Sequence, residues 1–208
     1  MRIKVFDGIL WGVTFLLVVT VFLMPDTVPL HWDENWQIDG YGSRYMFLIL
    51  AFIPMAIYYG MSLTKHIDPK RMNLEKRKKT YRLFQYGLTV FFLILAAFFE
   101  YSAFNPQQDG EQFVLLLVSV LLIGMGNYLP KIPQNYFFGV KTPWTLASEY
   151  VWKKTHKISG YCFVVIGLIT GISALAHFSY TYLVLMIGVL GACKASFQVQ
   201  EAGRDADI

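Results

Sequence analysis

The stretch GNYLPKIPQNYFFGVKTPWTLASEYVWKKTHKISG, residues 126–160, separates two long apolar runs and decides how the whole chain is interpreted. It contains five lysines, three prolines and two tryptophans. Such a segment is too basic to cross a lipid bilayer and too aromatic to be a flexible linker. Pro130 and Pro133 each lack a backbone donor, so they predict the end of the helix that precedes them. We therefore expect a folded segment between two membrane spans.

Within this central segment, Thr142 followed by Pro143 has the pattern of a helix N-cap with proline at the first helical position. Thr145 is a competing N-cap three residues later. The sequence predicts a short amphipathic cytoplasmic helix over about residues 145–157. Spacings of four residues would align four side chains on one face of that helix: Trp144, Ser148, Trp152 and His156.

The composition of the chain indicates a membrane protein. Of its 208 residues 55% are hydrophobic and only 15% are charged, whereas a soluble domain carries roughly a quarter charged residues. Six apolar runs are near the roughly 17–25 residues that a spanning helix needs: 8–24, 45–64, 83–99, 112–129, 158–176 and 178–193. We interpret the first run as a retained helix, because no small-residue cleavage site follows it. The predicted fold is an all-α polytopic integral membrane protein with six transmembrane helices.

These runs predict a single membrane domain over residues 1–208, built from three helical hairpins with a basic loop and a folded segment between them. The first hairpin, with an acidic outer loop, spans residues 1–64, and a basic cytoplasmic loop follows at 65–82. The second hairpin spans 83–129, and the cytoplasmic loop and helix span 130–157. The third hairpin and the C-terminal tail span 158–208.

Lysine and arginine are distributed unevenly between the loops. Residues 65–82 hold eight of them, whereas residues 25–44 hold one, against four acidic residues. The positive-inside rule therefore predicts that both termini, the 65–82 loop and the central segment are cytoplasmic. The net charge of +4 follows from the same rule, and no zinc-knuckle or RNA-binding signature accompanies it, so we expect no direct nucleic-acid partner. The basic loop is interpreted as a topology signal that attracts anionic lipid, with a docking site for a cytoplasmic protein as the alternative.

The first outward loop, residues 25–44, combines acidic and aromatic side chains. His31, Asp33, Glu34 and Asp39 are suitable metal ligands, but their spacing matches no site that we can name, so we predict neither metal nor cofactor. Its aromatic residues are expected to anchor the loop at the membrane interface, and a binding surface for an extracellular peptide is the alternative: Trp32, Trp36 and Tyr41. Asp39-Gly40 and Tyr41-Gly42 are turn signals.

Ionisable residues within the apolar runs are few. Asp7 lies near the predicted inner surface and Glu100 near an outer helix end, so both are expected to reach water. A transporter usually carries charges deep within its spans, and this chain has few ionisable residues there. A small transporter or exporter is therefore the alternative function and not the first choice. Gly167 and Gly171 form a GxxxG pair that predicts close helix packing, with spans five and six as a tight hairpin. No catalytic constellation is present, so we predict that the chain is not an enzyme, and an intramembrane enzyme or metalloprotein is the least favoured alternative.

Two groups of residues resemble a known family. The central segment, with GN at 126–127, GVKTPWTL at 139–146, Glu149, VW at 151–152 and TH at 155–156, is similar to the SdpI family of bacterial membrane proteins, named for immunity to a peptide toxin. The outer segment, with Pro25, VPLHW at 28–32 and DGYGS at 39–43, resembles a small domain of unknown function that commonly precedes it. Together the two signatures cover about a third of the chain.

The resemblance implies a multi-pass protein of the bacterial plasma membrane that gives immunity to, or senses, a secreted antimicrobial peptide toxin. It also implies a possible cytoplasmic partner, a transcriptional repressor, beside the membrane lipid. It supplies no catalytic residue. The candidate functional positions that it implies are explained equally by folding of the segment and by ligand contact: Asn127, Asn135, Gly139, Thr142, Pro143, Trp144, Thr145, Glu149, Trp152 and His156. The outer loop adds four candidate ligand-binding residues: His31, Trp32, Asp33 and Asp39.

Overall fold

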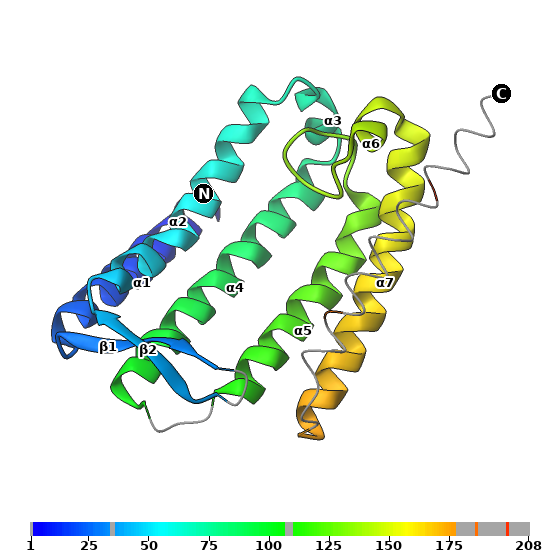
Figure 1. Cartoon of the computed structure of the whole chain (residues 1–208). Coiled ribbons are helices and arrows are strands. Elements are labelled where there is room, and N and C mark those ends of the chain that lie inside the picture. Colours follow the sequence, from blue (N-terminus) through cyan, green and yellow to red (C-terminus); the bar gives the residue numbers. More distant parts are fainter. Residues whose placement is uncertain (1, 34–35, 107–109, 178–185, 187–198, 200–208) are drawn as a thin grey trace. The chain divides into compact units, whose positions relative to one another are not determined.

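The computed structural model describes residues 2–33, 36–106, 110–177, 186 and 199, and it is predominantly helical (Figure 1). Two compact units make up the chain. The first unit combines Met1–Gly60 with Tyr86–Val114, and the second combines Met61–Gln85 with Leu115–Ile208. Three long helices contribute residues to both units, because the boundary falls within each of them.

Among the described residues, five helices are long and apolar enough to cross a membrane. They are α1 (Arg2–Leu23), α2 (Met46–Ile67), α4 (Lys78–Phe104), α5 (Glu111–Tyr128) and α7 (Glu149–Leu175). The predicted class of helical membrane protein is confirmed. The predicted sixth span, 178–193, lies outside the described residues. Pro54 lies inside α2, in agreement with its place within the apolar run 45–64.

The first unit packs α1 against α2 and α4. Buried side chains of α1 form three apolar clusters with the two other helices. In one of them Ala51 and Ala96 are completely buried beside Leu17, and these small side chains let the helices approach closely. At one end of the unit, Val28 extends the core beyond the helices, where it packs with Val21 and Met24.

The outer loop of the first unit is a two-stranded antiparallel ribbon of β1 (Thr27–Trp32) and β2 (Ile38–Ser43), so the all-α prediction is wrong for this segment. The predicted turns at Asp39-Gly40 and Tyr41-Gly42 are also wrong, because both pairs lie inside β2. A Cβ atom at Gly40 would stand 2.9 Å from the Cβ of His31 on the facing strand, so glycine leaves room for the cross-strand pair. The chain instead turns between the strands, where Trp36 has a φ of 57°.

In the second unit the predicted basic loop, 65–82, is largely helical. α2 continues to Ile67, α3 spans Arg71–Lys76, and α4 begins at Lys78. The connection between α5 and α7 contains a 3-10 turn, η1 (Leu129–Lys131), and a short helix, α6 (Pro143–Ala147). The sequence predicted the end of α5 correctly, since Pro130 lies in η1.

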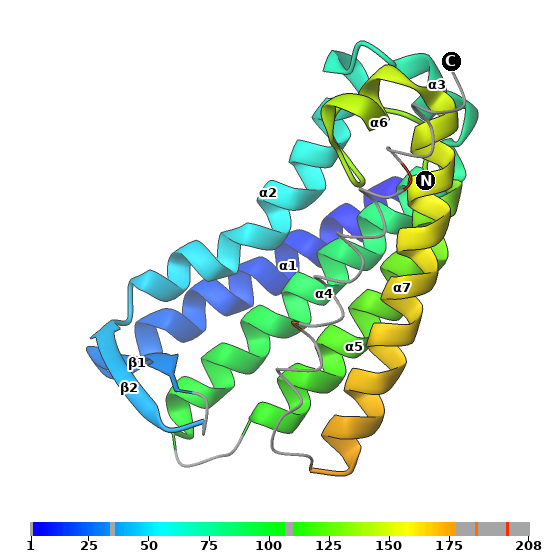
Figure 2. The same ribbon diagram turned by 45° about the vertical axis from the view of Figure 1, so that its right-hand side comes forward.

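Helices α5 and α7 of the second unit lie side by side in both views (Figure 1 and Figure 2). A Cβ atom at Gly126 would stand 2.6 Å from the carbonyl oxygen of Gly160, so the two backbones touch at a point where only glycine fits. The predicted GxxxG pair also packs, since a Cβ atom at Gly167 would meet the carbonyl oxygen of Ser119 on α5 at 2.9 Å. The predicted hairpin of spans five and six falls outside the described residues.

Candidate functional site

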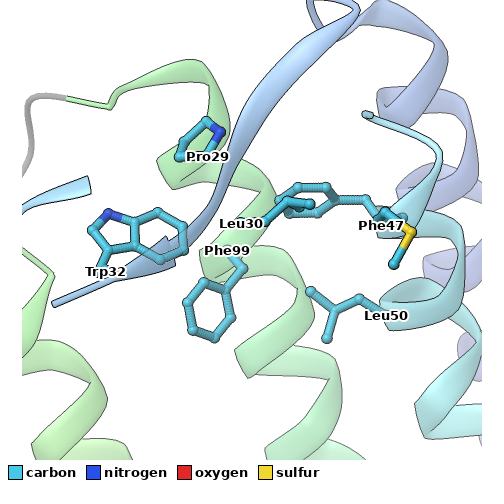
Figure 3. Close-up of a pocket in the computed structure, with 7 residues that line it drawn as sticks. Pro29, Leu30, Trp32, Phe47, Leu50 and Phe99 are labelled. Atoms are coloured by element: carbon cyan, nitrogen blue, oxygen red, sulfur yellow. The ribbon is translucent and has the colours of Figure 1, made fainter. Parts of the chain in front are cut away.

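An apolar cavity of about 200 Å³ lies beside the ribbon in the first unit. Side chains from β1, α2 and α4 face it (Figure 3), among them Pro29, Leu30, Trp32, Phe47, Leu50 and Phe99. Trp32 is held in place by two rings, since its centroid lies 5.7 Å from that of Trp36 and 5.5 Å from that of Phe99. Trp32 is therefore part of a packed aromatic wall, and its anchoring at the membrane interface stays a prediction.

The polar residues of the ribbon are partly used by the fold itself. One carboxylate oxygen of Asp33 accepts the backbone N–H of Gln37 at 2.7 Å, which stabilises the turn between the strands. His31 Nδ1 lies 2.5 Å from a carboxylate oxygen of Asp39, and both side chains are exposed. Glu34 lies outside the described residues. In the part of the chain that the structure describes, no three His, Cys, Asp or Glu side chains gather as a metal site.

Arg44 connects the end of the ribbon to the start of its first strand. Its guanidinium donates to the carbonyl of Met24 at 2.7 Å and lies 3.2 Å from a carboxylate oxygen of Asp26. A hydrogen bond from the guanidinium to the Tyr45 hydroxyl raises the pKa of Arg44 above its ordinary value. The contacts of Arg44 with Met24 and Asp26 keep the two ends of the ribbon together.

A second arrangement of predicted residues lies around His156 in the second unit. His156 is only 1% exposed, and its ring stacks on that of Trp152 with 4.0 Å between centroids. The backbone N–H of Val140 donates to His156 Nε2 at 3.1 Å, so this nitrogen carries no proton. Nδ1 then donates to the carbonyl of Trp152, 2.9 Å away. These two contacts fix a neutral tautomer of the imidazole.

Gly139 lets the chain approach that ring. It has a φ of 107°, which L-residues with side chains rarely adopt, and a Cβ atom there would collide with His156 Nε2. Just before it, Asn135 is completely buried and organises a turn through both ends of its amide. Its Oδ1 accepts from the N–H groups of Phe137 and Phe138 at 2.9 and 2.7 Å, while its Nδ2 donates to the carbonyl of Pro133 at 2.9 Å.

Thr142 and Thr145 form a reciprocal capping box at the start of α6, so the predicted N-cap at Thr142 with Pro143 at the first helical position is confirmed. The Thr145 hydroxyl accepts the N–H of Thr142 at 2.8 Å and donates to the carbonyl of Val140 at 3.0 Å. Thr145 therefore completes the cap of Thr142 and does not compete with it.

The predicted single short helix over about residues 145–157 is wrong, because these residues belong to two helices. Ser148 has an extended backbone, with φ −123° and ψ 124°, so it ends α6 and caps α7 through its side chain. α7 then continues to Leu175 as one of the five long apolar helices of the described part of the chain, so residues 149–157 are its first turns. The predicted stripe is broken, because half-buried Trp144 lies on α6 whereas Trp152 and His156 lie on α7.

Two of the predicted positions do not join this cluster. Asn127 is exposed and donates to the carbonyl of Ile123 in its own helix at 2.8 Å. Glu149 is an exposed residue that pairs with Lys153, one helical turn on, at 2.8 Å. The Trp152 indole, by contrast, is anchored inside the cluster, since it donates to the carbonyl of Ile132 at 3.0 Å.

Sequence reasoning missed the residues that join the 65–82 segment to the central segment. The buried carboxylate of Asp68 accepts the backbone N–H of Lys70 at 2.6 Å and that of Tyr136 at 2.9 Å. The Lys70 ammonium donates to the Gln134 side chain, and the Asn73 amide donates to the Gln134 carbonyl at 3.1 Å. The Asp68-Pro69 pair was the only local signal. It indicates a turn, but it does not indicate which segment the turn contacts.

Glu100 was expected to reach water, and that prediction is also wrong. Glu100 is 3% exposed and lies inside α4, which runs five residues further than predicted, to Phe104. The hydroxyl of Thr20 donates to one of its carboxylate oxygens. Within the described residues, the other oxygen has no hydrogen-bond partner.

Comparison with known proteins agrees with the two signatures. The model of the SdpI/YfhL protein family matches residues 131–195, and that of a domain of unknown function (DUF1648) matches residues 9–55. The chain is 26% identical over 191 residues to a protein of Bacillus subtilis (strain 168) named "Immunity protein SdpI", covering 91% of this chain and 89% of that protein. No solved structure matches the chain. The predicted resemblance to the SdpI family is confirmed, and the ribbon and the His156 cluster each lie in one of the two matched regions.

Proposed function

We propose that this chain, which is similar to an SdpI immunity protein over nearly its whole length, is a membrane immunity protein that recognises a secreted antimicrobial peptide. The observation that carries the proposal is the 26% identity to the immunity protein of Bacillus subtilis, over 91% of this chain. A match of that extent includes both the ribbon and the His156 cluster, so it supports a shared role and not only shared membrane helices.

The charge distribution supports an orientation in which the ribbon reaches a secreted peptide. The eight basic residues of the 65–82 segment belong in the cytoplasm by the positive-inside rule, as do both termini. α2 leads from the ribbon at one end to that segment at the other. The ribbon is then outside the bacterial plasma membrane, where the toxin arrives.

The cavity beside the ribbon supports a binding mode without covalent chemistry. Its walls are apolar and aromatic, and Trp32 and Phe99 are rigid rings that give large contact area at a low cost in side-chain entropy. It would take one or two apolar side chains of the peptide. The exposed carboxylate of Asp39 at the ribbon surface would attract a cationic peptide at short range.

The finer proposal, signalling to a cytoplasmic transcriptional repressor, rests on the family resemblance. The central segment offers a surface of the required kind, because it is folded and carries exposed aromatic side chains: Tyr136, Phe137 and Tyr150. The buried positions around His156 would shape this surface and not touch the partner.

Expression of the chain in a toxin-sensitive strain, followed by a killing curve with the purified peptide, tests the immunity proposal. We expect survival of cells that carry the protein in the membrane. Equal killing of cells with and without the protein, at confirmed membrane levels, would overturn it for that peptide.

One observation favours a second candidate function, a small transporter or exporter. Glu100 is an ionisable residue buried within an apolar helix, and such residues mark ion or substrate pathways more often than they serve packing. Replacement by glutamine distinguishes the two candidates. A transporter would lose substrate movement with Glu100→Gln, whereas protection by peptide binding at the ribbon would remain.

A further inference from the structure

We propose that the second unit holds a binding site for a phosphate group, of the kind carried by anionic phospholipid headgroups, in a basic cavity formed by α3, η1 and the first turn of α7. The cavity has a volume of about 280 Å³. This is near the lower end of small-molecule sites, roughly 300–1,000 Å³, so it suits a compact anion. The site is separate from the ribbon cavity and independent of the immunity role.

The charges of this basic cavity are strongly unbalanced. Four cationic side chains line it against a single carboxylate: Lys76, Arg77, Lys131 and Lys153 against Glu149. Glu149 is paired with Lys153 at 2.8 Å. Among the described residues, no carboxylate lies within ion-pair distance of Lys76, Arg77 or Lys131. Three of the four cations therefore line the cavity without an ion pair to a described carboxylate, and the excess of positive charge favours an anion there.

Buried contacts hold the wall of the basic cavity, so the segments that carry the cations stay near one another without a ligand. Trp152 and Ile132 are both buried, and the indole donates to the Ile132 carbonyl at 3.0 Å. The Asn73 amide joins α3 to the central segment through the Gln134 carbonyl. Lys76 and Arg77 on one side, and Lys131 on the other, are thus brought together by a folded contact and not by chance approach of flexible loops.

The position of the cavity along the helices points to a membrane headgroup as the source of the phosphate. Lys131 ends one apolar span and Glu149 begins another, so the cavity lies where two spans leave the hydrocarbon. Figure 2 shows α3, α6 and the start of α7 together at this end of the second unit. The Lys131 ammonium lies 5.2 Å from the ring centroid of Tyr128, a pairing typical of the interface. Basic pockets between spans on the cytoplasmic side are known binding sites for anionic headgroups.

The test uses the full-length purified protein and compares two triple variants with the same change of charge. The cavity variant is Lys76→Gln, Arg77→Gln and Lys131→Gln. The matched control is Arg71→Gln, Lys78→Gln and Lys79→Gln, three exposed basic residues of the same region that do not line the cavity. Native mass spectrometry then measures how much phosphatidylglycerol, against phosphatidylcholine, each protein retains from mixed vesicles.

We expect the wild type and the control to retain phosphatidylglycerol in preference to phosphatidylcholine. Each cation that contacts the bound phosphate should contribute about a fivefold factor in affinity, so the cavity variant should lose on the order of a hundredfold. The control residues do not line the cavity and should not cause this loss. Glu149→Gln frees Lys153 and should increase retention, a gain that misfolding cannot mimic. Equal losses in the two triple variants, or no preference for the anionic lipid, would overturn the proposal.

A second arm identifies the source of the phosphate. Inorganic phosphate is added to detergent-purified protein without lipid, and its thermal stabilisation is measured for the same variants. Stabilisation of wild type and control, but not of the cavity variant, would assign the site to a free phosphate. Retention of phosphatidylglycerol without any effect of inorganic phosphate would assign it to the lipid headgroup. Binding of an acidic peptide by the cavity, with neither phosphate source bound, would contradict the proposal.

Discussion

The backbone N–H of Val140 donates to Nε2 of His156, 3.1 Å away, and so ties the loop before α6 to the second turn of α7. The contact depends on the residue just before Val140, because Gly139 has a φ of 107° and no side chain. The GV pair at 139–140 and the TH pair at 155–156, which are separated in the sequence, therefore form one structural element. Folding of the second unit therefore explains why the central segment contains both pairs.

Gly139→Ala should destabilise the second unit. The new methyl group would collide with the imidazole, and a non-glycine residue at this φ costs about 1–3 kcal/mol. The midpoint of thermal unfolding in detergent measures the effect. Gly124→Ala on α5 is the matched control, because a Cβ atom there meets nothing within 4 Å. A similar shift for both variants would mean that the Gly139 contact has no special role.

Trp152→Ala should cost more stability than Trp144→Ala. The Trp152 side chain is almost completely buried and donates to Ile132, and loss of a buried aromatic costs about 3–5 kcal/mol. Trp144 is half-buried on α6. Accumulation in the membrane and the unfolding midpoint compare the two variants. If they accumulate equally well, the two rings contribute alike and the break at Ser148 does not separate their roles.

Asp68→Asn should loosen the contact between the 65–82 segment and the central segment. Both oxygens of the buried carboxylate accept backbone N–H groups, and the amide would place a donor opposite one of them. An unsatisfied buried donor costs about 1–3 kcal/mol. Limited proteolysis of the second unit should then become faster than in Glu75→Gln, an exposed control on α3. Equal rates would indicate that the segments stay together without this carboxylate.

The helical spans were predictable because hydropathy and proline positions are local properties of the sequence. The ribbon was missed because Gly40 and Gly42 look like turn residues, whereas they make room for side chains on the facing strand. The break at Ser148 was hidden by the helical spacing of Trp144, Trp152 and His156. The contact of Asp68 with Tyr136 joins residues 68 positions apart, and no local sequence pattern around either residue indicates the other.

The orientation of the ribbon is tested by labelling of single cysteines in intact cells, with Cys162 and Cys193 replaced by alanine. Tyr41→Cys, at an exposed position of β2, should react with an impermeant maleimide, and Glu75→Cys on α3 should react only after permeabilisation. The reverse pattern would place the basic segment outside and would remove the ribbon from the reach of a secreted peptide.

Protection of cells by a variant of Trp32, in the apolar cavity beside the ribbon, tests the account most directly. Trp32→Ala removes a wall of the apolar cavity, whereas Tyr41→Ala removes an exposed ring of the same ribbon that does not line it. Both are expressed in a toxin-sensitive strain, their membrane levels are matched, and survival is measured against peptide concentration. We predict that wild type and Tyr41→Ala protect the cells, and that Trp32→Ala protects only at lower toxin concentrations. Protection by Trp32→Ala equal to that of the wild type, at equal membrane levels, would contradict recognition of the peptide at the ribbon.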